Sequence, residues 1–216
     1  MKKIIFILFV LCLQLTGFAQ KSRVGFFIGP VFSDLRGTVD GKKLIGDTKS
    51  GFAAGFLVDA PIKNHFDFQP TLYYVQKGTI KQKPLGPTQK DEISIELRYA
   101  ELDLNFLYNT NGAKGSFFIG AGPSISFNLP SKTLTKSPGD LKSETEITFG
   151  NAISNNYRGV DFGANFLTGF KMSGGFFVSA NYSLGLRNLI PEASLAKGDT
   201  KNTCFGVSLG WLIKNK

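Results

Sequence analysis

The sequence has little of what catalytic and metal sites are usually built from. Its 216 residues include one histidine, two cysteines, one tryptophan and two methionines. No Ser/His/Asp set, no cluster of metal ligands and no phosphate-binding glycine loop is present. Two cysteines also exclude a disulfide-rich scaffold. Beyond residue 19 no uninterrupted apolar run reaches about 18 residues, so no candidate for a membrane-spanning helix follows.

Charged residues are also scarce, whereas glycine and aromatic residues are abundant. Charged residues make up 19% of the chain, hydrophobic residues 42% and aromatic residues 13%, with 21 Phe and 25 Gly. This composition can bury a core, which excludes a disordered chain. The glycines follow no fixed period, which excludes a collagen-like chain. At this length a single domain is expected.

The N-terminus has the three parts of a secretory signal peptide. Met1-Lys2-Lys3 is positive, residues 4–15 are apolar except for Gln14, and Thr16-Gly-Phe-Ala19 supplies small residues before Gln20. We predict a signal peptide over 1–19 and a mature domain over 20–216. A buried N-terminal helix is the alternative. Cleavage would leave Cys204 as the lone cysteine, which excludes an internal disulfide.

Period-two alternation dominates the mature sequence. From 117 to 129 the odd positions are mostly bulky and apolar, and the even positions from 120 onward are Gly, Ser or Asn. Similar alternation covers 100–108, 160–170 and 176–186, and no segment shows a helical period. Such alternation predicts strands. Eight are expected, over 22–32, 51–60, 65–77, 93–108, 116–129, 157–170, 175–187 and 202–213.

The connections between these strands alternate in length. Residues 61–64, 109–115 and 171–174 form short gaps, whereas 33–50, 78–92, 130–156 and 188–201 form long ones. Strict alternation places every long loop at one end of an up-and-down meander and every short turn at the other. Outer-membrane barrels have this layout, with short periplasmic turns and longer external loops.

Alternation alone does not say which face is wet. A soluble, secreted barrel that carries an apolar ligand would alternate too, with its apolar row inside. An eight-stranded bore is only wide enough for its own side chains or one small ligand, and eight bulky rows would overfill it. We therefore predict an all-β, eight-stranded antiparallel up-and-down transmembrane β-barrel with the bulky row facing lipid. The crowded bore then explains strand glycines: Gly25, Gly55, Gly120, Gly122, Gly163 and Gly206.

Aromatic residues near the strand ends fit two belts at the water–lipid boundaries. Those near the short turns are Phe66, Phe68, Tyr108, Phe117, Phe170, Phe176 and Trp211. Those near the long loops are Phe32, Tyr74, Phe127 and Tyr157.

Four motifs in order carry a family resemblance. They are Tyr99-Ala-Glu-Leu-Asp-Leu, Phe117-Phe-Ile-Gly-Ala-Gly-Pro123, Asp161-Phe-Gly-Ala-Asn and Tyr182-Ser-Leu-Gly-Leu-Arg-Asn188. The mature chain resembles the PorT-type outer membrane protein β-barrel domain family, often labelled porin family proteins. The resemblance implies an outer-membrane location, and one branch of the family is associated with export of surface proteins. The ending Trp211-Leu-Ile-Lys-Asn-Lys departs from the usual terminal aromatic residue.

The polar residues of the inward row are the first candidate site. Buried carboxylates must be paired, hydrogen-bonded, hydrated or protonated. We predict a lumenal polar network that fills the bore and fixes the strand register, with a cation or proton path as the alternative. Its residues are Arg23, Asp59, Asp67, Glu101, Asp103 and Asp161. His65 lies at a short turn and Cys204 has inward parity, so neither is expected to be catalytic. We predict no enzyme activity and no cofactor.

The cations of the long loops and flanking strand ends are the second candidate. They outnumber the acids of the same spans and include Lys77, Lys81, Lys83 and Lys90. Lys81, Lys83 and Lys90 are predicted to contact lipopolysaccharide phosphates, with ordinary solvated surface as the alternative. No basic patch interleaved with aromatics suggests nucleic-acid binding.

The sequence thus favours a non-enzymatic integral outer-membrane barrel. Its long external loops would provide surface interaction or an envelope role, with a protein partner met chiefly by the longest loop, 130–156. The alternatives are an accessory role in protein export across the outer membrane and the soluble ligand-binding barrel.

Overall fold

The computed structural model describes residues 22–86, 89–110, 112–139 and 141–213. The predicted signal peptide lies outside these residues. Within them, no helix is long and apolar enough to cross a bilayer. The long strands are β1 (Arg23–Val39), β3 (Asp47–Lys63), β4 (Phe66–Pro84), β5 (Lys90–Asn109), β6 (Gly115–Ser137), β8 (Val160–Met172), β9 (Phe176–Gly185) and β10 (Gly198–Ile213), and the short ones are β2 (Lys42–Lys43) and β7 (Leu141–Ile147).

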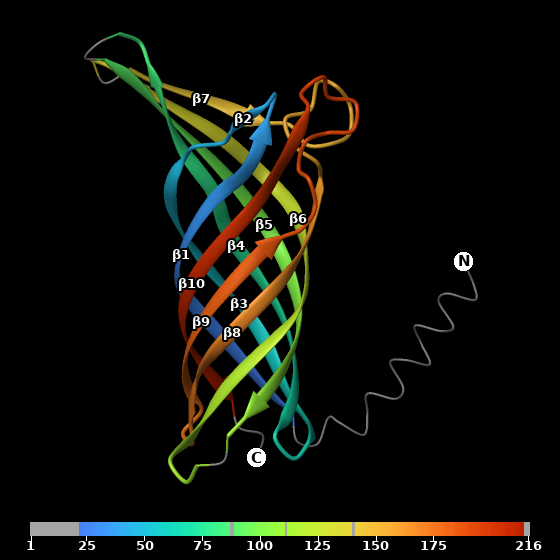
Figure 1. The fold of residues 1–216 in the computed structure, drawn as a ribbon. Helices are drawn as coiled ribbons and strands as arrows, with labels where there is room; N and C mark the ends of the chain where they lie inside the picture. Colours follow the sequence, from blue (N-terminus) through green and yellow to red (C-terminus); the bar gives the residue numbers. More distant parts are fainter. Residues whose placement is uncertain (1–21, 87–88, 111, 140, 214–216) are drawn as a thin grey trace.

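The long strands form a closed ring. Each pairs antiparallel with its neighbours in the order β1, β3, β4, β5, β6, β8, β9, β10. The ring closes because β10 pairs with β1, from Val24↔Ile213 to Val39↔Gly198. Figure 1 shows the strands tilted around a common axis. The eight-stranded up-and-down barrel predicted from the sequence is therefore confirmed for the described residues. Closure leaves the ring no unpaired strand edge.

The strands continue well beyond their predicted ends on the long-loop side. The β4–β5 ladder runs without a break to Pro84↔Lys90, so most of the predicted loop 78–92 is strand. In the predicted loop 130–156, β6 continues to Ser137 and β7 pairs beside it, from Ser131↔Ile147 to Ser137↔Leu141. The predicted loops were too long because no bulky apolar row faces outward in these segments, although strand pairing persists.

The short connections lie where the sequence places them. They are residues 64–65 between β3 and β4, 110–114 between β5 and β6, and 173–175 between β8 and β9. Asn64 has a positive φ of 51° in the first of these turns. His65, in the same turn, stacks on Tyr108 with ring centroids 5.5 Å apart. The prediction of a turn position for His65 is confirmed.

The bulky apolar row faces outward all around the ring. Ile28, Phe56 and Ile119 expose 60%, 68% and 63% of their surface. A continuous apolar surface is unusual for a protein in water and typical of a lipid-facing barrel. The opposite row is crowded: a Cβ on Gly55 or Gly120 would come within 2.3 Å of a neighbouring side-chain atom. The predicted orientation of the two rows is confirmed, and it excludes the soluble ligand-carrying barrel.

The aromatic belt at the short-turn end is built from cross-strand pairs. Phe66 meets Tyr108 at 5.4 Å between ring centroids, and Phe117 meets Phe170 at 4.8 Å. At the long-loop end Phe127 is exposed. Tyr157 was wrongly assigned to this second belt. It packs against buried apolar residues inside the ring, because it lies in the loop before β8 and folds back over the opening.

Candidate functional site

One group of ion pairs lies in the bore near the short turns. Asp59 of β3 accepts hydrogen bonds from Arg23 of β1 at 2.7 Å and from Lys171 of β8 at 2.6 Å. Lys171 also donates to Asp67 of β4 at 3.1 Å, and Gln69 donates to Asp59 at 3.3 Å. Two cations thus face two carboxylates in what we call the short-turn cluster: Arg23, Asp59, Asp67, Gln69 and Lys171. These contacts link four strands across the bore.

A second group of buried polar residues lies farther toward the long loops. The carboxylate of Glu101 accepts hydrogen bonds from Lys77 at 2.5 Å, from Tyr73 at 2.6 Å and from Ser126 at 2.7 Å. Tyr73 also lies 3.1 Å from Asp103. We call these five residues the central cluster. It joins β4, β5 and β6, and its one ammonium group faces two carboxylates.

Asp161 of β8 pairs with an amide instead of a cation. Asn202 of β10 donates to Asp161 at 2.9 Å and to the phenol of Tyr99 at 3.0 Å. Between the two clusters, Asn165 donates to Asn105 at 3.2 Å. Hydrogen bonds from neutral amides satisfy buried polar acceptors without placing another charged group in the bore.

The structure therefore places all six acids and bases of the predicted lumenal network in the bore, but two of its cations were missed. The sequence pattern places Lys77 among the loop cations and Lys171 in a short turn. Both side chains are buried, with 5% and 4% exposed. Their inward parity was the available signal: Lys77 follows Tyr73 and Val75 on the inward side of β4.

Some buried polar atoms keep spare hydrogen-bonding capacity. Within the described part of the chain, Asp103 Oδ1, Asp161 Oδ1 and Asn202 Oδ1 have no hydrogen-bond partner. A cavity of about 50 Å³ adjoins Asp103 and is also lined by Lys77, Asn105, Lys171 and Cys204. This is room for a little water and far too little for an open aqueous channel.

From the level of the central cluster, with which they share Tyr73, toward the long loops, apolar side chains fill the bore. We call this group the apolar plug: Val31, Leu35, Ala53, Tyr73, Val75, Ile95, Leu97, Tyr99, Ile147, Leu189 and Cys204. Leu97, Tyr99 and Leu189 are completely buried. The sequence-based expectation that glycines and polar residues fill the bore is wrong for this end. The expectation for Cys204, a small buried residue in the inward row, is confirmed.

The plug marks a switch in the polarity pattern of the strands. On β5, Ile93, Ile95, Leu97 and Tyr99 are apolar and point inward, while Glu92, Ser94, Glu96 and Arg98 between them are polar. From residue 100 to 108 the apolar row is the outward one. An apolar inner row with a polar outer row is the pattern of a sheet in water. The membrane boundary on β5 therefore lies at Tyr99–Ala100.

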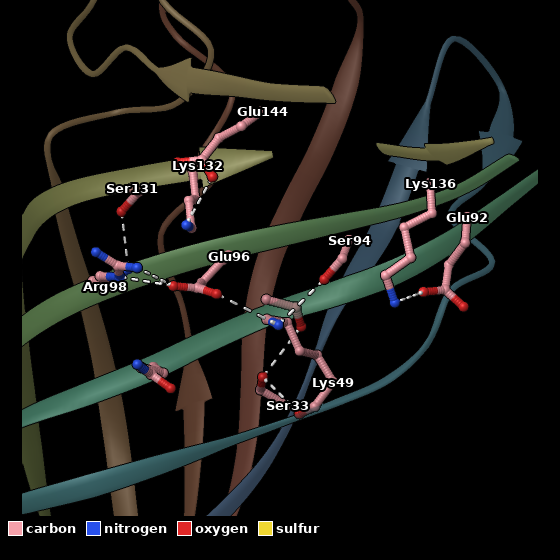
Figure 2. Close-up of polar contacts among 12 residues, drawn as sticks. Ser33, Lys49, Glu92, Ser94, Glu96, Arg98, Ser131, Lys132, Lys136 and Glu144 are labelled. Carbon is pink, nitrogen blue, oxygen red and sulfur yellow. Dashed lines mark hydrogen bonds and ion pairs between the residues drawn. The ribbon is translucent and has the colours of Figure 1, made fainter. Parts of the chain in front are cut away.

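Beyond that boundary, β4 to β7 continue as a polar sheet. We call it the extended sheet: residues 76–84, 90–98, 131–137 and 141–147. Figure 2 shows its ion pairs: Arg98 with Glu96, Lys132 with Glu144 at 3.0 Å, and Lys136 with Glu92 at 3.1 Å. Among the described strands, β7 pairs only with β6, so the extended sheet has a free edge.

The side chain of Lys49 on β3 passes over Gly78 of β4 and reaches the extended sheet on β5. Its ammonium group lies 3.2 Å from Ser94 Oγ and 3.8 Å from Glu96 on β5 (Figure 2). A Cβ on Gly78 would lie 3.1 Å from Lys49 Cδ and 1.9 Å from a backbone oxygen, and Gly78 has a φ of 145°. Gly78 thus leaves the space through which a β3 side chain reaches β5.

The three lysines predicted to contact lipopolysaccharide do not form one cluster. Lys81 and Lys83 lie two residues apart on β4 and share one face of the strand, and Lys81 lines a pocket at the barrel opening. Lys90 of β5 is exposed, and its ammonium group contacts the side chain of Gln82. Lys81 is thus partly covered at the pocket, whereas Lys83 and Lys90 are exposed.

Comparisons with known proteins give a family match and several similar solved structures. A family model described as outer membrane protein beta-barrel domain matches residues 18–191. The fold is similar to that of the attachment invasion locus protein Ail of Yersinia pestis, in complex with the heparin analogue sucrose octasulfate. That similarity has 13% identity and a TM-score of 0.43, and covers 89% of this chain and 99% of that one.

Two further solved structures are similar. Neisserial surface protein A matches at 11% identity with a TM-score of 0.40, covering 86% of this chain and 96% of that one. The N-terminal β-barrel domain of Pseudomonas aeruginosa OprF matches at 11% identity with a TM-score of 0.30, covering 87% and 97%. A comparison with curated protein sequences finds no match.

Proposed function

The chain belongs to the outer membrane protein β-barrel domain family, and from that premise we propose that it is a non-enzymatic surface-interaction protein of the outer membrane. The barrel anchors the molecule in the bilayer. The extended sheet stands clear of the membrane on the outer side and contacts a protein partner. The observation that carries this proposal is the polarity switch at Tyr99–Ala100, beyond which the paired strands present a polar outer surface.

The β6–β7 hairpin is the proposed contact element. It falls within the longest loop predicted from the sequence, 130–156, and forms one side of the extended sheet, with the free edge of β7. Exposed edge strands can accept an added strand from a partner. Lys142, Glu144 and Glu146 on β7 discourage unspecific pairing, as charged residues do on natural edge strands. A partner would therefore need matching charges as well as an extended backbone.

We propose that the side chains in the bore close it and have a structural role. The two clusters are linked across several strands, and the apolar plug fills the bore from the central cluster toward the long loops. This arrangement supports a structural role that fixes strand register more than a path for ions. A single-channel conductance in planar bilayers that Asp103→Asn abolishes would instead support the cation or proton path.

Lipopolysaccharide contact through the exposed cations is a further part of the proposal. Lys83 and Lys90 are exposed at the tip of the β4–β5 hairpin. We propose that they bridge lipopolysaccharide phosphates, and that Lys81 adds little because it faces the opening. Unchanged co-purification of lipopolysaccharide with a Lys83→Gln, Lys90→Gln double variant would support ordinary solvated surface.

Within the family, the four sequence motifs support placement in the PorT-type branch, which is the basis for the export alternative. A pull-down of the barrel in detergent distinguishes the two functions. Recovery of export components that depends on the short turns would favour the export role. Recovery of a surface partner that depends on the β6–β7 hairpin would favour the proposal.

Labelling of intact cells tests the proposed orientation. A Ser143→Cys variant on β7 is expected to react fully with a membrane-impermeant maleimide before the outer membrane is permeabilised. The matched control is Gly174→Cys in the β8–β9 turn, where an added Cβ meets no atom within 4 Å. It should react only after permeabilisation. Native Cys204 is 3% exposed and should stay unreactive in both.

The opposite labelling pattern would overturn the orientation. If Gly174→Cys reacts in intact cells and Ser143→Cys does not, the extended sheet faces the periplasm and cannot meet an external partner.

A further inference from the structure

A pocket of about 280 Å³ opens at the long-loop end of the barrel, above the apolar plug. Most of its lining is apolar: Leu35, Val39, Leu44, Ile147, Ile190, Pro191 and Ala196. Thr133, Asn156, Tyr157, Ser194 and Thr200 add polar groups, and Lys81 adds the one charge among the described lining residues. Its volume lies near the lower end of the range for small-molecule sites.

The pocket is built from fixed parts of the fold. Leu35, Lys81 and Thr133 come from β1, β4 and β6. The loops after β7 and β9 hold each other in place on the remaining side. Arg158 donates to the carbonyl oxygen of Ile190 at 2.7 Å and pairs with Glu192 at 3.1 Å. A pocket walled by strands and braced loops needs little ordering when a ligand binds, which favours affinity.

Lys81 differs from the paired cations at this end, and it is the charged residue among the described residues that line the pocket. Lys49, Arg98, Lys132 and Lys136 each pair with a glutamate. Among the described residues, no hydrogen-bond acceptor or carboxylate lies in pairing distance of Lys81. An ammonium group at the wall of an apolar pocket attracts an anion more strongly than one in open water. Lys81 thus supplies charge complementarity for a ligand that the pocket can enclose.

We propose that this pocket binds a small amphipathic monocarboxylate, with the carboxylate at Lys81 and the apolar body against Leu35, Val39 and Ile190. One ammonium group balances one negative charge, whereas a phosphate dianion would bring a second charge without a partner into apolar surroundings. Burial raises the pKa of Tyr157 to about 12. Its phenol therefore stays protonated at neutral pH and can donate to an anion.

The pocket shares Thr133 and Ile147 with the β6–β7 hairpin, but it lies at the barrel opening, whereas the proposed partner contact is the free backbone edge of β7. The two proposals can therefore fail independently. Loss of ligand binding would leave the role of the β6–β7 hairpin untouched.

Calorimetric titration of the barrel in lipid nanodiscs, with empty nanodiscs subtracted, tests the site. The probes are 4-phenylbutyrate and its neutral analogue 4-phenylbutanamide. A charged hydrogen bond in place of a neutral one is expected to make the carboxylate bind about tenfold more tightly. Equal affinity for the two probes, or no binding of either, would overturn the proposal.

Three variants locate the binding. Lys81→Met keeps most of the length of the side chain without its charge and should abolish the preference for the carboxylate. Lys83→Met, two residues along the same strand, is the matched control and should keep it. Ala196→Leu fills the pocket and should weaken both probes. A preference that survives in Lys81→Met, or is lost equally in Lys83→Met, would show that the anion binds elsewhere.

Discussion

Replacing Lys77 by methionine is expected to destabilise the barrel by about 3–5 kcal/mol, the usual effect of removing one partner of a buried ion pair. Lys77 is 5% exposed and Glu101 is fully buried. Methionine fills similar space, so the loss comes mainly from leaving Glu101 and Asp103 without a cation. The measurement is guanidinium chloride unfolding of barrels in phospholipid vesicles, followed by the fluorescence of Trp211, the one tryptophan.

Two further variants separate charge from packing. Adding Glu101→Gln to Lys77→Met should recover part of the stability, because the buried carboxylate is then gone, and a double-mutant cycle gives the coupling energy. Lys142→Met on exposed β7 is the matched control and should change stability by no more than about 0.5 kcal/mol. A comparably small effect of Lys77→Met would mean that the pair contributes nothing to stability.

The second large effect concerns the outward face. Ile28→Arg should impair barrel assembly and cost about 2–4 kcal/mol of stability, as arginine does near the midplane on the lipid face. Ile28 lies halfway along the outward row of β1 from Val24 to Phe32 and is 60% exposed. The measurements are the unfolding titration above and the shift in gel migration on boiling, which a compact barrel shows.

Leu141→Arg is the matched control for this prediction. Leu141 on β7 is 69% exposed, as open as Ile28, but it lies on the extended sheet beyond the membrane boundary. Arginine there should be neutral within about 0.5 kcal/mol. Both side chains are widely exposed, so a large effect at Ile28 and none at Leu141 would indicate that lipid surrounds the first and water the second. Equal, small effects of both substitutions would contradict a lipid-facing belt.

The ring itself was predictable because its signal is local. Alternation over 100–108 or 117–129 can be seen in one strand, and the spacing of turns sets the order of strands. The alternation of apolar and polar residues along β5 also marks the membrane boundary. Ile93, Ile95 and Leu97 have the inward parity, opposite to that of Leu102 and Leu104, but the two patterns join into one run that predicts a single strand over 93–108.

The lumenal ion pairs were less predictable. The parity of Asp59 and Glu101 identifies them as inward, but not which cation they meet. Lys171 reaches Asp59 across the bore from a strand 112 residues away. Such a contact depends on the strand register and on how far the bore extends past the membrane. Both are properties of the assembled barrel, so the sequence of a single strand does not reveal them. The predicted strand 65–77 ends at Lys77, whereas β4 continues to Pro84. The sequence therefore does not show that Lys77 lies inside the bore.

Closure of the ring between its first and last strands has a consequence for folding in the cell. Val24 pairs with Ile213 and Val39 with Gly198. This β1–β10 seam cannot form until nearly the whole chain has crossed the periplasm. Until then β1 and β10 are unpaired edges next to bulky apolar rows, a combination prone to aggregation. Contacts this distant in sequence also form slowly. The chain must therefore be kept apart from its own copies in transit, and the seam is where an insertion machine would have to hold it open.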